Sequence, residues 1–310
     1  MLLNNRKEFP ALTGLRAVAA SMVFLFHYLH ELPLPADTVV FGIFKEFHTG
    51  VLVFFVLSGF LITYHYDSDN DAGKTKYRPY LLQRLLRIYP LYLLLLCLMY
   101  LHEGPPDFIR TFTNVTLLKT FFRYLSLSGI PQSWSLTFEL VFYAGAPFLF
   151  VAIKRFGYVR FYIAVFVFGI ALTAFGILLK KLEMNHYGFF ESLYFFAWGT
   201  VFGRFTEFFA GVLLAHYIQG RFLFKLPELR SFSYTTLGAL GFFICLYLIR
   251  SFTDSQIQVG IATKPGLFVH NFILPFTVAL FMYGLITEKT VIRKFLSSRV
   301  LVLAGAASYV

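Results

Sequence analysis

The chain has 310 residues, of which 58% are hydrophobic, 20% aromatic and only 14% charged, and its mean hydropathy is +0.68. Because soluble domains carry about 25% charged residues, this composition excludes an ordinary soluble protein and indicates an integral membrane protein. The net charge of +11 does not indicate nucleic-acid binding, because the basic residues form short clusters between apolar runs, as cytoplasmic loops do.

Apolar runs long enough to cross a bilayer recur along the whole chain. They predict an all-α, polytopic transmembrane helical bundle of about nine spans, the last of them truncated at Val310. The expected spans cover residues 11–30, 48–66, 85–102, 134–153, 159–179, 200–218, 232–250, 268–286 and the run from 300 onward. Residues 1–310 are accordingly expected to form a single integral-membrane domain, incomplete at its C-terminus.

The first span is predicted to be retained, because Arg16 interrupts its apolar region and no small-x-small cleavage site follows. The loop after the second span is rich in Lys and Arg, which predicts that it is cytoplasmic and places the N-terminus inside as well. Segments 31–47, 103–132 and 180–199 then fall outside, where a short interfacial helix is expected over Phe121–Leu127. The expected location is the cytoplasmic membrane.

Cys97 and Cys245 both lie inside apolar runs. They are predicted to be small buried hydrophobic residues without a disulfide, and no spacing of ligands indicates a metal site.

Arg16 and His27 are eleven positions apart in the first span. In a helix this spacing is about three turns plus 20°, so both side chains project from one face, some 16 Å apart along the axis. An intramembrane arginine is costly unless it faces protein or water, and histidine is suited to general-base work near neutral pH. The alternatives are an arginine that snorkels to the surface and a histidine that bonds a neighbouring helix.

Arg84 and Arg87 are three apart at the cytoplasmic entrance of the third span. Two arginines on one helix face match phosphate oxygens, so the pair is a candidate docking point for the phosphates of a cytosolic donor. The alternative is charge that only sets topology.

Glu139 lies about five residues inside the fourth span, at a depth similar to that of His27. A carboxylate there needs a partner or water, and it could orient the imidazole of His27 and support its charged form. The alternative is a structural salt bridge with an intramembrane arginine.

Arg204 and Glu207 are three apart in the sixth span and are predicted to satisfy one another. Gly211 and Gly59 predict close helix packing. Ser133 and Ser135, beside Trp134, are predicted to cap the fourth span or to bond a polar acceptor, with capping favoured.

These segments resemble the acyltransferase family 3 of integral-membrane O-acyltransferases. The strongest element is FPALTGLRAVAASMVFLFHY, with an arginine, ten residues and a histidine at Arg16 and His27. Further similar segments are VFFVLSGFLI (53–62), LLQRLLRIYPLY (81–92), SWSLTFELVFY (133–143) and RFTEFFAGVLLA (204–215). The resemblance covers the chain from Phe9 to Tyr309, where the family continues into a further closing helix.

The resemblance implies transfer of an acyl group, most often acetyl, from cytosolic acyl-CoA to a hydroxyl of a cell-surface or lipid-linked glycan. No permanently bound cofactor is implied, and acyl-CoA is the co-substrate. Carried onto this sequence, Arg84 and Arg87 would hold the CoA phosphates and Arg16 would line the path of the pantetheine arm. His27 would be the base on the acceptor hydroxyl or a transient acyl carrier, with Glu139 orienting it. Trp134, Ser135, Arg204 and Glu207 would have structural or acceptor-side roles.

Two alternatives from other classes remain. Intramembrane Arg, His and Glu also suit a transporter or flippase of a polar or glycolipid substrate, although no convincing internal repeat supports it. The truncated last span also fits an inactive remnant.

Overall fold

The computed structural model describes residues 9–28, 39–67, 77–227, 233–253 and 259–308. These residues form α-helices, short 3₁₀ turns and one π-helical turn. Within this part of the chain, the only β-structure is an isolated antiparallel bridge between Phe122 and Phe189. The prediction of an all-α protein is confirmed for the described residues.

Within the described residues, seven helical stretches are long and apolar enough to cross a membrane, which indicates a membrane protein. They are Pro10–His27, Phe41–Tyr66, Tyr77–Glu103, Pro131–Phe156, Tyr158–Lys181, Tyr234–Ser251 and Lys264–Thr287.

The predicted number of about nine spans is not confirmed. The expected sixth span is the helix α9 (Phe205–Ile218), whose 14 residues reach only about 21 Å, less than the roughly 30 Å of a hydrocarbon core. The run after residue 299 forms α14 (Arg299–Ala307), with 9 residues. Nearly all of α9 is buried, so neighbouring protein covers its ends and it does not need the length of a lipid-facing span.

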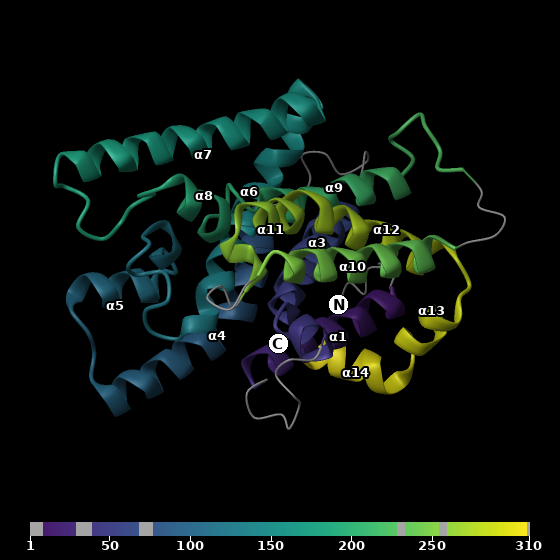
Figure 1. The fold of residues 1–310 in the computed structure, drawn as a ribbon, viewed down its shortest axis with the longest axis horizontal. Coiled ribbons are helices and arrows are strands. Elements are labelled where there is room, and N and C mark those ends of the chain that lie inside the picture. The colour runs from purple at the N-terminus through teal and green to yellow at the C-terminus, as the bar shows by residue number, and fades with distance from the viewer. Residues whose placement is uncertain (1–8, 29–38, 68–76, 228–232, 254–258, 309–310) are drawn as a thin grey trace. The chain divides into compact units, whose positions relative to one another are not determined.

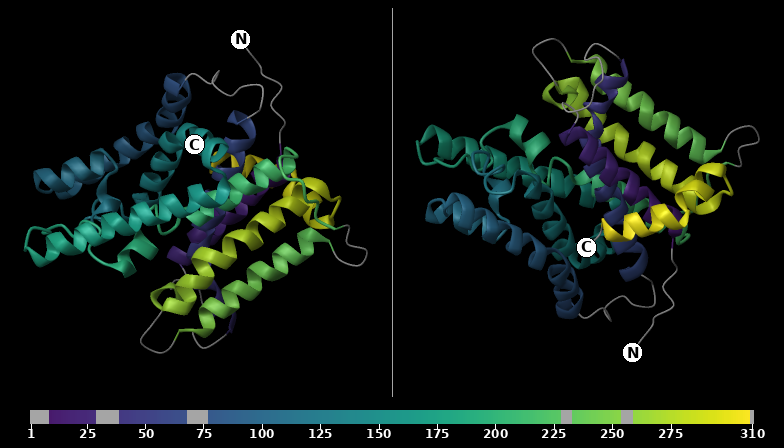
Figure 2. Two further views of the ribbon diagram at one scale, coloured as in Figure 1. Left: turned by 90° about the horizontal axis from the view of Figure 1, so that it is seen from above. Right: turned by 90° about the horizontal axis from the view of Figure 1, so that it is seen from below.

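The chain divides into two compact units, Met1–His65 with Thr206–Val310, and Tyr66–Phe205. Each is described by itself. The helices of the first unit besides α9 and α14 are α1 (Pro10–His27), α2 (Val39–Phe44), η2 (Phe47–Thr49), α3 (Gly50–Tyr66), α10 (Tyr234–Ser251), η5 (Gly260–Ala262), α11 (Lys264–Phe268), the π-helix η6 (Val269–Ile273), α12 (Leu274–Thr287) and α13 (Val291–Leu296). Figures 1 and 2 show α10 beside α12 and α1 beside α14, and both pairs are in extensive contact.

The centre of the first unit is the crossing of α3 and α9, which the two predicted glycines allow. A Cβ built on Gly59 would lie 2.0 Å from the carbonyl oxygen of Phe208, and one built on Gly211 would lie 2.0 Å from that of Val56. Both obstacles are backbone atoms, which cannot rotate away. The prediction that these glycines mark close helix packing is therefore confirmed.

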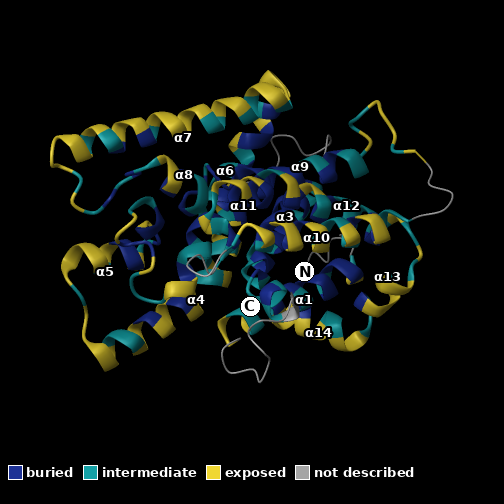
Figure 3. Ribbon diagram, in the orientation of Figure 1, coloured by how far each residue is buried: buried dark blue, intermediate teal, exposed yellow. Residues whose placement is uncertain are grey.

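The second unit contains α4 (Tyr77–Glu103), α5 (Phe108–Val115), η3 (Lys119–Phe121), η4 (Pro131–Ser133), α6 (Trp134–Phe156), α7 (Tyr158–Lys181) and α8 (Leu193–Gly199). The helix α6 packs against both α4 and α7. Gly157 adopts a φ of 81°, which ends α6 and lets α7 begin at the next residue. Only 11% of the spanning window of α4 and 17% of that of α7 are buried, so both expose apolar faces suited to lipid (Figure 3).

Three local predictions are wrong. Phe121–Leu127 is not a helix, because the chain leaves the η3 turn at Phe121, pairs Phe122 with Phe189 and continues in turns. Cys97 is exposed on α4, on a helix that buries little of its surface, whereas Cys245 is buried as expected.

The third concerns the start of α6. Ser133 occupies the N-cap position but makes no capping hydrogen bond; its hydroxyl donates to the carbonyl oxygen of Ile130, at 2.7 Å. The hydroxyl of Ser135 likewise donates to the carbonyl oxygen of Gln132, at 3.2 Å. Ser133 has φ −72° and ψ 0°, whereas a capping residue typically has β-region dihedral angles, so its hydroxyl is not placed to accept from the first N–H groups of α6.

Candidate functional site

His27 is the last residue of α1, and its side chain is exposed. Its Nδ1 lies 2.8 Å from the carbonyl oxygen of Val23, one turn earlier. A carbonyl oxygen can only accept a hydrogen bond, so Nδ1 carries the proton and Nε2 keeps its lone pair. The ring thus presents a basic nitrogen outward, as a proton acceptor or nucleophile must.

Arg16 lies on the same unbroken helix and is only 8% exposed. At 1.5 Å per residue its Cα is about 16 Å from that of His27 along the axis, with the two side chains about 20° apart around it. A snorkelling arginine would be exposed, so this burial favours a polar environment inside the protein.

Arg84 lies among three tyrosine rings of the second unit. Its guanidinium carbon is 5.6 Å from the ring centre of Tyr66, 5.9 Å from that of Tyr80 and 5.4 Å from that of Tyr143. These are cation–π distances, which hold the guanidinium in a fixed place. Arg87, three residues later, is exposed.

The arginine pair does not stand at the entrance of its helix, because α4 begins at Tyr77, eight residues before the predicted span. Arg84 is therefore about 10 Å along α4. With 27 residues, α4 is about 40 Å long, which is more than the hydrocarbon thickness of about 30 Å, so the helix is long enough to extend beyond the membrane core.

Glu139 accepts a hydrogen bond from the hydroxyl of Tyr143, at 3.0 Å. Because the ring of Tyr143 also lies against Arg84, a single tyrosine connects the carboxylate with the arginine. His27 belongs to the first unit and Glu139 to the second, so the pairing of these two side chains stays a prediction.

Arg204 is buried, and its guanidinium carbon lies 5.0 Å from the ring centre of Trp134 and 6.0 Å from that of Phe138. Trp134 thus has a structural partner at the start of α6, next to Ser135. The expected pairing of Arg204 with Glu207 joins the two units and stays a prediction.

Glu207 is fully buried in the first unit, where its Oε1 lies 3.8 Å from Nδ1 of His270. His270 is on the π-helix η6, and π-helical turns are frequent at functional sites. Its Nδ1 is also 2.9 Å from Oδ1 of Asn271.

A second carboxylate–histidine pair lies beside the first. Oε2 of Glu46 is 3.1 Å from Nε2 of His48, and the rings of His48 and His270 are 5.7 Å apart, centre to centre. Sequence reasoning did not identify Glu46, His48 or His270, since the first was assigned to a loop and the others to the ends of apolar runs. Two adjacent polar residues in an apolar run, such as His270 and Asn271, were the available signal.

Segments 103–132 and 180–199, predicted to lie outside the membrane, are tied together in the second unit. The carboxylate of Glu191 contacts Nη1 of Arg123 at 2.7 Å, the hydroxyl of Tyr124 at 2.7 Å and Nζ of Lys180 at 3.4 Å. Burial raises the pKa of Glu191, but the Tyr124 hydroxyl and the two cations outweigh it and hold the pKa below its usual value. The first part of the third such segment, residues 31–38, lies outside the described residues.

The same region buries a lysine. Lys119 is 0% exposed, and its Nζ donates to the carbonyl oxygens of Ser128 at 2.6 Å and Ile130 at 2.9 Å. Burial lowers the pKa of Lys119 to about 8. The lysine thus fixes the path of the chain before α6.

The profile of the acyltransferase domain that defines acyltransferase family 3 matches residues 9–310. The chain belongs to this family. Proteins named "Putative O-acetyltransferase" from Staphylococcus aureus strains COL and N315 are each 24% identical over 98% of the chain, which spans 49% of their length. "Putative acetyltransferase ORF330" from Acidianus two-tailed virus is 27% identical over 97% of the chain and 80% of that protein. No solved structure matches the chain significantly.

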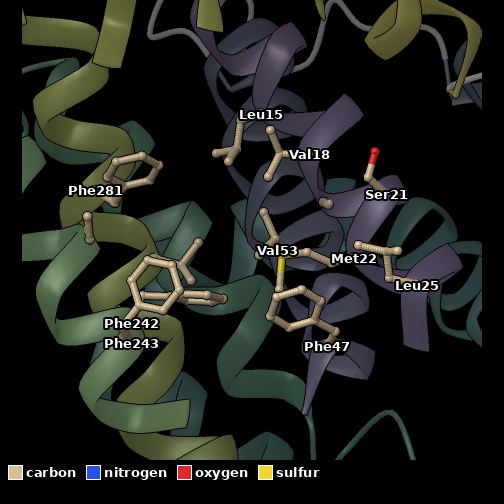
Figure 4. Close-up of a pocket in the computed structure, with 13 residues that line it drawn as sticks. Leu15, Val18, Ser21, Met22, Leu25, Phe47, Val53, Phe242, Phe243 and Phe281 are labelled. Atoms are coloured by element: carbon tan, nitrogen blue, oxygen red, sulfur yellow. The ribbon is translucent and has the colours of Figure 1, made fainter. Parts of the chain in front are cut away.

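The acyltransferase domain also contains an apolar cavity of about 300 Å³ in its first unit (Figure 4). It is lined by Leu15, Val18, Ala19, Ser21, Met22, Leu25, Phe47, Val53, Ala239, Phe242, Phe243, Val278 and Phe281. At 100° per residue, the side chains that α1 contributes point on average roughly 140° away from Arg16 and 160° away from His27. The cavity therefore lies on the opposite face of α1 from these two residues.

The described residues contain no group of three or more His, Cys, Asp and Glu side chains placed to hold a metal ion. What this part of the chain offers is acid–base and cationic chemistry, divided between the two units. The first holds Arg16, His27 and the two carboxylate–histidine pairs; the second holds Arg84, Arg87 and Glu139.

Proposed function

We propose that the chain is a membrane O-acyltransferase that moves an acyl group, acetyl by default, from cytosolic acyl-CoA to a hydroxyl of a cell-surface or lipid-linked glycan. The setting proposed is the cytoplasmic membrane, with the N-terminus inside. The match to the family profile over residues 9–310 supports acyl transfer, and the names of the relatives favour an oxygen acceptor and an acetyl group.

The observation that carries the proposal is the arrangement on α1. A buried arginine and an exposed histidine with a defined tautomer share one face of a single unbroken helix. The guanidinium of Arg16 can bind polar groups along the arm of acyl-CoA, and the imidazole nitrogen of His27 can take part in the reaction at its acyl end.

In the proposed reaction, the acceptor hydroxyl oxygen attacks the thioester carbonyl carbon. The new C–O bond forms as the C–S bond breaks, the sulfur leaves with the bonding electron pair, and the hydroxyl proton passes through an imidazole to the thiolate. His27 acts at Nε2, either as this base or as a nucleophile that carries the acyl group between donor and acceptor. Glu139 would orient it, and Arg84 with Arg87 would hold the CoA phosphates.

The test of His27 uses membranes from cells expressing the full chain, supplied with radiolabelled acetyl-CoA, with label counted in the extracted glycan fraction. His27→Ala is compared with His65→Ala. His65 on α3 is a matched control, because its Nδ1 also bonds the carbonyl oxygen one turn earlier, Leu61 O at 2.9 Å. We expect His27→Ala to lose about 10²–10⁴-fold in rate, the usual contribution of an acid–base group, while His65→Ala stays near wild type.

The arginine pair is tested by the dependence of the rate on acetyl-CoA concentration. We expect Arg84→Ala and Arg87→Ala to raise the KM for acetyl-CoA, because a cation–phosphate contact acts on binding of the donor. Arg78→Ala is the control: this exposed arginine on α4 removes the same charge about 180° around the helix from Arg87.

Equal rates in His27→Ala and His65→Ala would remove His27 from the mechanism. No incorporation by the wild-type chain, with the native acceptor present, would refute acyl transfer and favour transport of a polar or glycolipid substrate.

A further inference from the structure

Four ionisable side chains, three of them buried and His48 partly buried, meet in the first unit as two carboxylate–histidine pairs. The Glu46–His48 pair is 3.1 Å apart and the Glu207–His270 pair 3.8 Å, with side-chain exposures of 15% for His48, 3% for His270 and 0% for both carboxylates. An intramembrane cluster of this kind is costly to bury, which makes a functional role the default hypothesis.

The Glu46–His48 pair has the geometry of a general base with its orienting carboxylate. Oε1 of Glu46 accepts a hydrogen bond from the backbone N–H of Gly260 at 2.9 Å, so the carboxylate is held in place from a segment 214 residues away. Its Oε2 faces Nε2 of His48, which therefore donates and leaves Nδ1 as the basic nitrogen. A carboxylate held against an imidazole orients the ring and stabilises its charged form.

His48 and His27 differ in the partner of their N–H groups. The N–H of His27 bonds a backbone carbonyl oxygen of its own helix, whereas that of His48 bonds a buried carboxylate, with Glu207 behind the neighbouring ring of His270. A carboxylate that holds one ring nitrogen fixes the orientation of the other, as in a catalytic triad.

The two histidines are also neighbours. The ring of Phe26 lies edge-on against both, with its centre 5.2 Å from that of His27 and 5.4 Å from that of His48. One phenylalanine thus lies between an exposed imidazole and a partly exposed one.

We propose that the Glu46–His48 pair is a second acid–base site of the domain and accepts the proton of the acceptor hydroxyl. This inference rests on the proposed acyl transfer. In the step, the hydroxyl oxygen forms a bond to the acyl carbonyl carbon and its proton moves to Nδ1 of His48. The bond from that carbon to its leaving atom breaks, and the leaving atom, the thioester sulfur or Nε2 of an acylated His27, takes the electron pair. His48 then returns the proton to the CoA thiolate or to water.

The test compares His48→Gln, Glu46→Gln and the control His65→Gln in the radiolabelled acetyl-CoA assay. The glutamine at position 46 keeps an oxygen for the N–H of Gly260, but it removes the charge and places an NH2 group, which cannot accept a hydrogen bond, opposite Nε2 of His48. We expect a fall in kcat of at least about 100-fold for His48→Gln, a smaller fall for Glu46→Gln and none for His65→Gln, since a base acts on the chemical step. Monodisperse elution of each variant in detergent verifies folding.

Rescue separates a proton acceptor from a structural residue. In His48→Ala the removed ring leaves space beside Glu46, and added imidazole should restore at least one tenth of the wild-type rate. The same imidazole should not restore Glu46→Gln, whose ring is still present. Activity of His48→Gln within threefold of wild type, or no rescue of a well-folded His48→Ala, would overturn the second site while wild-type incorporation still upholds acyl transfer.

If the wild-type chain shows no acyl transfer, the Glu46–His48 pair can still be tested by a measurement that needs no enzymatic activity. Nitrogen NMR of ¹⁵N-histidine-labelled protein in nanodiscs, with the His48 signal assigned by its absence in His48→Gln, reports the protonation state of the ring. Reversible protonation of His48 that changes in Glu46→Gln supports a proton-accepting pair. A ring that stays neutral at every pH at which the protein is folded overturns it.

Discussion

Gly211 at the crossing of α3 and α9 gives the sharpest test of the fold. In Gly211→Ala the new Cβ would lie 2.0 Å from the carbonyl oxygen of Val56 and 2.6 Å from the backbone nitrogen of Phe60. Ordinary C···O contacts begin near about 3.3 Å, so the two helices must separate by roughly 1.3 Å.

The cost follows from that displacement. A gap of about 1 Å forfeits a quarter to a half of each dispersion contact, and overpacking of a core costs about 1–3 kcal/mol. Because the atoms in the way belong to the backbone, the loss of stability in Gly211→Ala should be about 3 kcal/mol, the upper end of that range. The better helix propensity of alanine offsets about 1 kcal/mol of this loss. The expected net loss in free energy of unfolding is about 2 kcal/mol, or a fall in Tm of about 4 °C for a chain of this length.

The assay is thermal unfolding of the purified chain in detergent. Gly145→Ala on α6 is the matched control, because a Cβ there meets no described atom within 4 Å, and it should keep Tm or raise it by about 2 °C. Gly59→Ala should resemble Gly211→Ala, and the double variant should cost less than the sum, since one separation of the helices admits both methyl groups. Equal Tm values for Gly211→Ala and Gly145→Ala would refute the close crossing.

Three further predictions concern loops and the cavity. The pKa of Lys119 is about 8 in the folded state and 10.5 in the unfolded chain, so the unfolded state binds more protons between about pH 8 and pH 10.5. The stability of the wild type should therefore rise with pH across that window, whereas that of Lys119→Met should not. Melting curves at several pH values test this. Glu191→Gln should cost about 2 kcal/mol at neutral pH by leaving Arg123 without its carboxylate. Because the folded-state pKa of Glu191 is lowered, the stability difference between variant and wild type is fully present above the unfolded pKa of 4.5 and should vanish as the pH falls through the folded pKa. If chemical denaturation gave the same difference down to low pH, the ion pair would be contradicted. Ala239→Leu should fill part of the apolar cavity and raise the free energy of unfolding by on the order of 1 kcal/mol. Acyl transfer should stay unchanged, because the cavity faces away from His27. Loss of activity would place the cavity in the reaction path.

Composition and periodicity determined the class of this protein and most of its helices. Apolar runs identify membrane helices because lipid forces every backbone polar group into a local hydrogen bond, so the signal is contained in consecutive residues. The shared face of Arg16 and His27 is likewise a property of one helix, and α1 is unbroken between them. Gly59 and Gly211 were identified because only a residue without a side chain permits such close backbone approach.

Whether an apolar run crosses the membrane, in contrast, depends on what surrounds it. The 14 residues of α9 suffice because other helices cover it, and no property of its own sequence states this. The Tyr143 contact that joins Glu139 to Arg84 also arises from two separate helices packing together.

The two carboxylate–histidine pairs were decided by tertiary structure alone. Glu46 is fixed by a backbone N–H 214 residues later, and His48 meets His270 across a similar separation. In the sequence Glu46 belongs to a loop and the two histidines lie near the ends of apolar runs, while Glu207 has a nearer candidate partner in Arg204. Contacts between distant segments leave no local pattern, because the packing of whole helices and not the spacing along the chain brings those side chains together.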